Sequence, residues 1–241
     1  MSQIDHKKRD AKKVQQMFSK IATRYDLLNH VLSLGLDRGW RQKVAWETRD
    51  MDCRKVLDVC TGTGDMAIEL CRFWKGKAFV EGIDFSHELM EIAREKSKKS
   101  GLDGKIIFRE GNAESLPYRD EQFDAVTITF GLRNINNRGN ALKEFYRVTR
   151  PGGCFVCLEF SHPANPVFQK IYSLYLLQVV PFVSRLFGSD PAAYQYLGNT
   201  IKDFPPPAEL VSLIESAGWK NATYKKLAGG IVAIHRGVKE E

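Results

Sequence analysis

A strand-like segment that runs directly into a glycine-rich turn constrains the fold of this chain more than any other feature. Residues 56–67 read Val-Leu-Asp-Val-Cys-Thr-Gly-Thr-Gly-Asp-Met-Ala, and a helix-compatible stretch follows from Asp65. Gly62 and Gly64 allow positive φ and let the backbone pass close to a ligand. The first turn of the helix offers unpaired N–H groups at its positive dipole end. The segment therefore predicts a nucleotide-type cofactor site on an α/β sheet.

The spacing alone leaves the identity of the cofactor open. Gly62, Gly64 and Ala67 match the G-x-G-x-x-A spacing of dinucleotide sites, which also occurs in turns that bind nothing. Asp58 stands before the glycines, where its carboxylate could accept a hydrogen bond from an ammonium group. S-adenosylmethionine carries such a group and NAD does not. Asp84, which ends the next expected strand, suits the ribose hydroxyls of either cofactor.

Strand-like and helix-like segments alternate through the middle of the chain. This alternation is typical of a parallel sheet with right-handed crossovers. Pro151 to Gly153 are expected to form the turn before the fifth strand, and Ser86 to cap a helix. The expected strands are 55–60, 78–84, 105–111, 123–130 and 154–160, and the expected helices include 65–74, 137–149 and 207–217.

We expect a single domain over 1–241, because no linker divides the chain. Gly35 is expected to end an N-terminal helix, and Gly229–Gly230 to join the two strands of a terminal hairpin. The expected parts are an N-terminal helical cap over 1–50, the cofactor-binding core over 55–160, a helical substrate-side insertion over 161–205, and a last helix with the hairpin over 206–241.

The composition is that of an ordinary globular protein, with 43% hydrophobic and 27% charged residues. The formal net charge is +7, and basic residues crowd the first thirteen positions. Such an arm is either solvated or contacts anionic lipid headgroups or nucleic acid. The most apolar stretch, 171–187, is interrupted by Gln178, Pro181 and Arg185. It is shorter than the roughly 20 apolar residues that span a bilayer, so no transmembrane helix is expected.

The chain has five cysteines, an odd number, and they show no repeated pairing motif. This indicates reduced thiols and a cytoplasmic location. Peripheral contact with the inner face of the cytoplasmic membrane is a further expectation. Cys154 and Cys157 have the C-x-x-C spacing of metal and redox sites. They fall in an expected strand, however, where residues three apart point to opposite faces. We therefore expect both to pack in the core and no metal to be bound.

Polar residues follow the expected strands at the edge where open α/β sheets bind their ligands. Asp58, Asp84, Asn112 and Thr129 all lie at carboxyl ends of strands. Asn112 and the following Ala113 can meet an adenine edge with a side-chain amide and a backbone N–H.

Together these features resemble the class I S-adenosylmethionine-dependent methyltransferases over residues 55–160. The resemblance implies an α/β, Rossmann-like fold, with a seven-stranded, mostly parallel sheet whose last strand is antiparallel. Cys60 stands where that class often has glycine, so the turn there is expected to keep a negative φ.

Further segments resemble the quinone-biosynthesis C-methyltransferases and extend the resemblance to nearly the whole chain. The matching segments are Phe18–Asp26, Thr129–Ile135, Leu158–Ser161, Tyr194–Leu197 and Gly229–Gly237. This resemblance implies S-adenosylmethionine as cofactor and a polyprenylated quinol as acceptor, with demethylmenaquinol first and a ubiquinone-pathway benzoquinol as the alternative. Carried over by position, the cofactor contacts are Thr63, Asp84, Asn112, Ala113 and Thr129.

The implied methyl transfer to a ring carbon needs the reduced quinol, because an oxidised quinone carbon is electrophilic. Arg133 is our first choice for the substrate side, as a cation that stabilises a developing phenolate or holds a water. The alternative for Arg133 is a structural ion pair. Asn134 could orient the ring, and His162 and Tyr25 are alternative proton acceptors.

The insertion has a broad apolar face between Val167 and Leu177. This face either packs on the core or in a homodimer, or it forms a wall for a polyprenyl tail and contacts a membrane surface. Three other functions stay open: a methyltransferase for another small molecule, an RNA-binding protein or RNA methyltransferase, and an inactive scaffold. The absence of a basic stripe interleaved with aromatic residues argues against a nucleic-acid partner. The acids at Asp58 and Asp84 argue against a scaffold.

Overall fold

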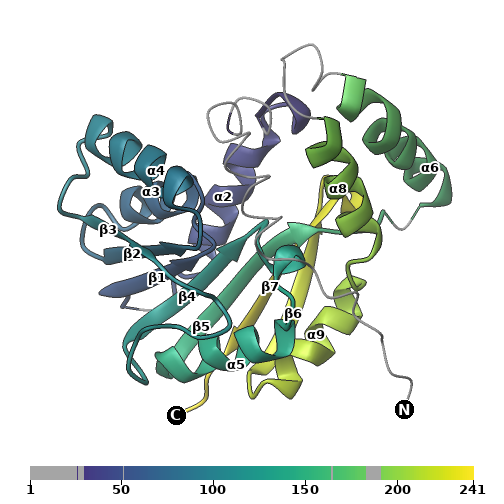
Figure 1. The fold of residues 1–241 in the computed structure, drawn as a ribbon. Coiled ribbons are helices and arrows are strands. Elements are labelled where there is room, and N and C mark those ends of the chain that lie inside the picture. The colour runs from purple at the N-terminus through teal and green to yellow at the C-terminus, as the bar shows by residue number, and fades with distance from the viewer. Residues whose placement is uncertain (1–25, 27–29, 51, 164, 183–190) are drawn as a thin grey trace.

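The computed structural model describes residues 26, 30–50, 52–163, 165–182 and 191–241. Its centre is a seven-stranded sheet with the order β3-β2-β1-β4-β5-β7-β6 (Figure 1). The neighbouring strands from β3 to β5 pair in parallel, and β7 pairs antiparallel with both β5 and β6. The expected α/β sheet with an antiparallel last strand is thereby confirmed. The strands are β1 (Lys55–Val59), β2 (Phe79–Asp84), β3 (Ile106–Glu110), β4 (Phe123–Thr129), β5 (Thr149–Phe160), β6 (Lys220–Leu227) and β7 (Val232–Val238).

Helices cover both faces of the sheet, and each face has its own apolar core. Residues of α2, α3 and α4 pack on one face, and residues of α5 and α9 pack on the other. Cys154 belongs to the first core and Cys157 to the second, which confirms that they point to opposite faces. The helices are α2 (Leu36–Trp46), α3 (Asp65–Phe73), α4 (His87–Lys99), α5 (Arg138–Val148), α6 (Pro166–Leu174), α8 (Pro191–Lys202) and α9 (Pro207–Ser216), with short turns η1 (Leu132–Asn134), η2 (Tyr175–Val179) and η3 (Ala228–Gly230).

Local capping chemistry explains several of the helix boundaries. Ser86 is the N-cap of α4, as predicted, and its side chain accepts a hydrogen bond from the backbone N–H of Leu89. Asn137 caps α5 in the same way and accepts from Asn140 at 3.0 Å. Gly35 adopts φ +77° between a helical turn at residues 30–32 and α2, so the predicted break is present.

The turn predicted at Pro151 to Gly153 is wrong. Strand β5 begins at Thr149 and runs through this segment, and the pairing with β4 jumps from Thr149 to Cys154. The extra residues form an irregularity inside the strand, where Gly152 takes φ +74°. A bulge of this kind absorbs residues without ending the strand, which is why a proline-glycine signal alone misplaced the boundary.

The insertion between β5 and α9 is helical, as expected, and consists of α6, the π-helical turn η2 and α8. Figure 1 shows α6 and α8 beyond the end of the sheet to which β4 and β5 point. Helix α8 contacts both η1 and η2, so the insertion is packed against the end of β4. None of the described helices is long and apolar enough to cross a membrane.

Candidate active site

The glycine-rich turn between β1 and α3 has the positive φ predicted for both of its glycines. Gly64 caps α3 with φ +80°, and a Cβ there would lie 2.9 Å from the Cβ of Ala93. Gly64 therefore allows α3 and α4 to pack closely. Gly62 has φ +54°, and a Cβ there would meet no atom of the described residues within 4 Å. The backbone at Gly62 therefore borders open space that a ligand can fill.

Cys60 adopts φ +54°, so the prediction of a negative φ at this position is wrong. Two contacts explain the positive φ of Cys60. The backbone N–H of Thr61 donates to the carbonyl of Ile83 at 3.1 Å, which bends the chain back toward β2. A Cβ on Gly131 would lie 2.5 Å from the Cβ of Cys60, so Cys60 fills the space that this glycine leaves. The tertiary contacts thus hold a side chain in a region that glycine usually occupies.

Asp58 is 1% exposed and fixes the turn to the sheet. Its carboxylate accepts hydrogen bonds from the hydroxyls of Thr61 at 2.7 Å and Thr127 at 2.8 Å. Burial, with a smaller contribution from the nearby Asp84, raises the pKa of Asp58 to about 7 against the effect of these two hydrogen bonds. The acid at the strand end is therefore poised to gain or lose a proton near neutral pH.

Asp84 joins the ends of β1 and β2. Its carboxylate accepts from the backbone N–H of Gly62 and from that of Ser86, both at 2.9 Å. Burial raises the pKa of Asp84, while the two backbone hydrogen bonds and one from Phe85 lower it. Each carboxylate oxygen has a second lone pair, so the group can still accept from ribose hydroxyls.

Asn112 and Ala113 lie beyond the end of β3, on the same edge of the sheet. The side-chain oxygen of Asn112 accepts from the backbone N–H of Glu114 at 2.9 Å, which fixes the turn. Ala113 is buried. At the end of β4, the buried hydroxyl of Thr129 has no hydrogen-bond partner among the described residues.

Thr63 belongs to a cluster with Asp26 and Lys96 that no sequence pattern predicted. Its hydroxyl donates to the carboxylate of Asp26 at 2.5 Å, and Lys96 of α4 pairs with Asp26 at 2.7 Å. Lys96 also pairs with Asp65 of α3, which in turn lies 3.1 Å from Arg41 of α2. These charges tie α2, α3 and α4 to the turn. Lys96 lies in a basic run that resembles an ordinary solvated helix face, so no sequence pattern pointed to this contact.

Arg133 lies in η1, directly after β4, and is 4% exposed. Its Nη1 is 2.9 Å from Oε1 of Glu159 at the end of β5, and its backbone N–H donates to Oε2 of the same residue at 3.1 Å. Nη1 also donates to the carbonyl of Phe130. The guanidinium thus forms a structural ion pair, which is the alternative role expected for Arg133. Its Nε has no hydrogen-bond partner in the described part of the chain.

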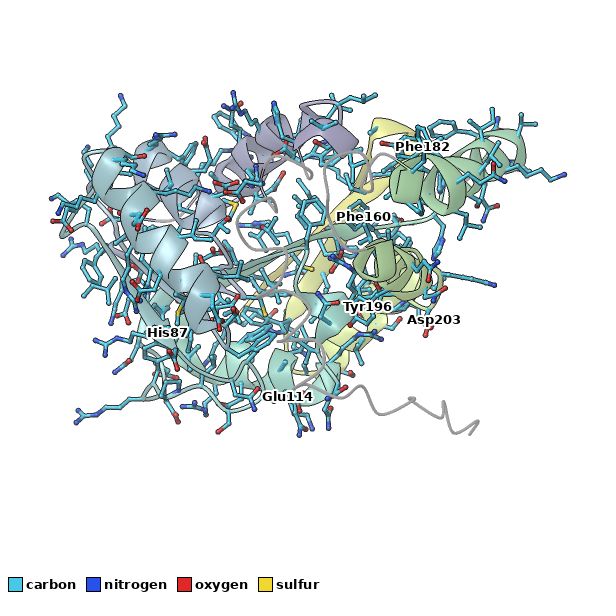
Figure 2. The ribbon with its side chains drawn as sticks, turned by 45° about the horizontal axis from the view of Figure 1, so that its top comes forward. His87, Glu114, Phe160, Phe182, Tyr196 and Asp203 are labelled. Carbon is cyan, nitrogen blue, oxygen red and sulfur yellow. The ribbon has the colours of Figure 1, made fainter. Side chains whose placement is uncertain are left out.

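Two aromatic rings border this ion pair. The Arg133 guanidinium lies 5.2 Å from the ring centre of Phe160, and Phe160 lies 4.7 Å from Phe130 at an interplanar angle of 32°. In Figure 2, the labelled Phe160 and Tyr196 lie in the half of the molecule that α6 and α8 occupy, and His87 lies in the half of α3 and α4. Phe130 directly follows β4 and Phe160 is the last residue of β5, a signal that sequence reasoning could have used.

The other predicted catalytic residues are placed as follows. Asn134 accepts a hydrogen bond from the Tyr196 hydroxyl of α8 at 3.2 Å. His162 lies with Nε2 3.2 Å from the carbonyl of Phe204, which requires a proton on Nε2 and leaves Nδ1 as the basic nitrogen of the neutral ring. Tyr25 lies outside the described residues.

Four buried polar atoms near the ends of β4 and β5 and in α6 lack hydrogen-bond partners among the residues that the structure describes. They are Thr129 Oγ1, Arg133 Nε, Ser161 Oγ and Tyr172 OH. Atoms of the same kind occur at three other places, Glu81, Tyr118 and His235. Because native proteins leave few buried polar atoms unpaired, their concentration here indicates a site for the polar groups of a ligand. No cluster of metal-ligating side chains occurs in the described segments.

The family profile and the similar proteins of known name agree on one family. The profile of the ubiE/COQ5 methyltransferase family matches residues 6–239. The ubiquinone/menaquinone biosynthesis C-methyltransferase UbiE of Geotalea daltonii is 40% identical over 94% of this chain and 96% of its own length. The demethylmenaquinone methyltransferase of Roseiflexus castenholzii is 39% identical over 95% of this chain and 94% of its own.

The fold is also found among solved structures. A structure described as an S-adenosylmethionine-dependent methyltransferase, possible histamine N-methyltransferase, from Thermotoga maritima superposes with a TM-score of 0.61 at 19% identity. The match covers 93% of this chain and 99% of that one, and confirms the class I methyltransferase fold. The match over residues 6–239, with relatives near 40% identity, places this chain in the ubiE/COQ5 methyltransferase family.

Proposed function

We propose that this protein transfers a methyl group from S-adenosylmethionine to a ring carbon of a polyprenylated quinol, with demethylmenaquinol as the first candidate. The printed names of the two relatives support the reaction class. The observation that carries the proposal in this chain is the buried Arg133–Glu159 pair beside Phe130 and Phe160. It places a fixed cation and an aromatic surface at the sheet edge where a planar, acidic ring would bind.

The residues at the glycine-rich turn fit S-adenosylmethionine. Within the described part of the chain, Gly62 borders open space and the Thr129 hydroxyl has no partner, and Asp84 retains acceptor capacity for ribose hydroxyls. Asp58 adds a negative charge near the turn when it is ionised, which favours a cationic ligand. When bound, S-adenosylmethionine supplies an electrophilic methyl group on a sulfonium.

The substrate side must make the ring carbon nucleophilic. A quinol hydroxyl loses its proton, the ring carbon forms a bond to the methyl group, and the C–S bond breaks with its electron pair on sulfur. The methylated carbon then loses its hydrogen as a proton, and the oxygen is reprotonated, so that one proton is released overall. Arg133 would stabilise the phenolate by charge, because a guanidinium keeps its proton in proteins and so cannot act as a base. Alignment of the reacting atoms can contribute roughly 7–11 kcal/mol.

Methyl transfer from labelled S-adenosylmethionine to short-tailed demethylmenaquinone, with and without a chemical reductant, tests the proposal. We expect label in the quinone only under reducing conditions, because only the quinol is nucleophilic. Labelling of the matching benzoquinol in place of the naphthoquinol would move the assignment to the ubiquinone pathway. Cofactor binding without transfer to either quinol would overturn the quinol substrate.

We also infer that the exposed apolar side of α6 and η2 rests on a membrane surface that holds the lipophilic substrate. Val167, Ile171 and Leu174 follow a helical spacing that puts them on one side, and Ile171 is 58% exposed. Leu177, Val179 and Phe182 continue the exposed apolar surface. The sequence contains no acidic residue between Glu159 and Asp190, which suits an anionic bilayer.

Flotation with vesicles that contain phosphatidylglycerol tests this membrane contact. We expect binding of the wild type and weaker binding of the double variant Ile171→Gln/Leu174→Gln, because apolar area is lost from the surface. Ile107→Gln on β3, which is also an exposed apolar position, is the matched control. A dimer that the double variant converts to monomer, with vesicle binding unchanged, would assign this surface to a second copy of the chain instead.

A further inference from the structure

The hydroxyl of Tyr172 in α6 is a candidate hydrogen-bond donor to a ligand. The residue is 8% exposed, and its hydroxyl is buried without a hydrogen-bond partner in the described segments. A buried polar group that loses water without gaining a partner destabilises the folded state. A ligand that accepts a hydrogen bond from this hydroxyl would remove that cost.

Helix α6 is anchored at several points, so the Tyr172 side chain has a defined position. Asn165 caps the helix and accepts from the backbone N–H of Val167 at 2.9 Å. Phe168, about one turn before Tyr172, packs on Gly229, where a Cβ would lie 2.7 Å from its ring. Because Gly229 has φ +67°, this close approach combines with a backbone conformation that other residues rarely adopt.

Tyr175 fixes the other end of the segment. Its ring is stacked with that of Tyr172, at 6.5 Å between centroids and an angle of 18°, and its hydroxyl donates to the carbonyl of Leu32 at 2.8 Å. Tyr175 also begins the π-helical turn η2, and such turns occur frequently at functional sites. Two tyrosines of one segment thus differ: the fold uses the hydroxyl of Tyr175, whereas that of Tyr172 has no partner among the residues that the structure describes.

The Tyr172 phenol belongs to the group of buried polar atoms at the ends of β4 and β5 and in α6, Arg133 Nε among them, that lack a partner in the described residues. Burial raises the pKa of Tyr172 far above the physiological range, with contributions from Tyr175 and Glu159 that outweigh the opposite effect of Arg133. The hydroxyl therefore stays protonated and can donate a hydrogen bond. Arg133 Nε is a second donor without a partner among the described groups of this region.

We propose that the Tyr172 hydroxyl and the Arg133 Nε–H together bind the ring oxygen of the quinol next to the carbon that is methylated. Two donors on one oxygen stabilise its ionised form and fix the rotation of the ring, so they determine which carbon faces the methyl group. Because Glu159 holds the guanidinium of Arg133 in a fixed position, Nε–H is already oriented as a donor to the phenolate. The inference rests on the proposed quinol substrate and adds a residue that selects and orients it.

A comparison of Tyr172→Phe with Tyr175→Phe tests the proposal. Both changes remove one hydroxyl from the same segment. For Tyr172→Phe we expect kcat/KM with the quinol to fall about 10- to 100-fold, as for the loss of one hydrogen bond to a charged group, with unchanged affinity for S-adenosylmethionine. Its Tm should stay level or rise, because an unpartnered buried group is removed. Tyr175→Phe should lower Tm, because the bond to Leu32 is lost, and leave kcat/KM near the wild-type value.

The pH profile gives a readout that a purely structural role would not change. The acid limb of kcat against pH should move to higher pH in Tyr172→Phe, because the bound phenolate loses a donor. A Tyr172→Phe enzyme with wild-type kcat/KM and an unshifted profile would overturn the inference while the quinol substrate stands.

A binding measurement separates this inference from the proposed function. Calorimetry of a short-tailed hydroquinone without oxygen, in the presence of S-adenosylhomocysteine, should show about tenfold weaker binding to Tyr172→Phe than to Tyr175→Phe. This outcome is required even if the wild type transfers no methyl group to the quinol. Equal affinities of the two variants would refute the assignment of Tyr172.

Discussion

The guanidinium of Arg133 and the carboxylate of Glu159 lie 2.9 Å apart, and both side chains are almost completely buried. The same carboxylate accepts the backbone N–H of Arg133, so one acid fixes both the main chain and the side chain of its partner. Two charges are costly to bury, and removal of one partner leaves the other uncompensated. The pair therefore joins the ends of β4 and β5 and sets the position of Arg133 Nε, which has no partner in the described segments.

Glu159→Gln should strongly destabilise the protein and reduce turnover. The change leaves the buried Arg133 charge without its partner, for which a loss of about 3–5 kcal/mol in the free energy of unfolding is typical. Chemical denaturation and methyl-transfer rates measure the two effects. Glu95→Gln, which removes the exposed 3.6 Å pair with Lys99, is the control and should change neither. A stable and fully active Glu159→Gln enzyme would contradict this role.

The two glycines of the turn should respond differently to alanine. Gly64→Ala places a Cβ 2.9 Å from that of Ala93 at φ +80°, so it should lower Tm more than Gly62→Ala. Gly62→Ala has no described neighbour to displace, but it adds a methyl group to the side where the cofactor is proposed to lie. We expect it to weaken S-adenosylmethionine binding at a modest cost in Tm. Calorimetry and thermal unfolding of both variants would reveal any reversal of this order.

Asp84→Ala should weaken the binding of S-adenosylmethionine before it affects turnover of the saturated enzyme. The change removes the acceptor of the Gly62 and Ser86 N–H groups, each unpaired buried group costing about 1–3 kcal/mol, and the proposed partner of the ribose. Glu110→Ala is a matched control, because Glu110 ends the adjacent β3 but is exposed. Equal cofactor affinities of the two variants, measured by calorimetry, would exclude Asp84 from the cofactor site.

The stability of the protein should fall as the pH rises from about 4 to about 7, because of Asp58. The pKa of Asp58 is raised from 3.8 to about 7 in the folded state, so in this range the folded state holds a proton that the unfolded state has lost. The free energy of unfolding then decreases with pH and levels off above about 7. Asp58→Asn cannot titrate and should lack this component. Denaturation curves of both proteins across the range give the difference, and a difference independent of pH would be inconsistent with the raised pKa.

The variant His162→Gln tests whether His162 only positions its segment or also accepts a proton. Glutamine can donate to the Phe204 carbonyl, as His162 Nε2 does at 3.2 Å, but it cannot accept a proton. If His162 only positions the segment, the glutamine variant should keep most of the turnover that His162→Ala loses. If turnover collapses equally in both variants, and the wild-type profile shows a matching pH dependence, His162 is the base.

The repeating parts of the fold could be read from the sequence, because they depend on neighbours in the chain. The strand, glycine turn and helix at residues 55–73 follow from periodicity and backbone freedom. The Ser86 and Asn137 caps follow from local hydrogen bonding. The opposite directions of Cys154 and Cys157 follow from the two-residue repeat of a strand.

Other features join residues that lie far apart in the chain, and these required the structure. Thr63 contacts Asp26 across 37 positions, and Arg133 pairs with Glu159 across 26. The positive φ of Cys60 depends on space beside Gly131, and the bulge in β5 on its pairing with β4. A sequence pattern shows which residue types are available, whereas partners, burial and strain depend on how distant elements pack. For this reason the class of the site follows from sequence patterns, whereas the structure shows that Glu159 holds Arg133 and that the Tyr172 hydroxyl has no partner among the described residues.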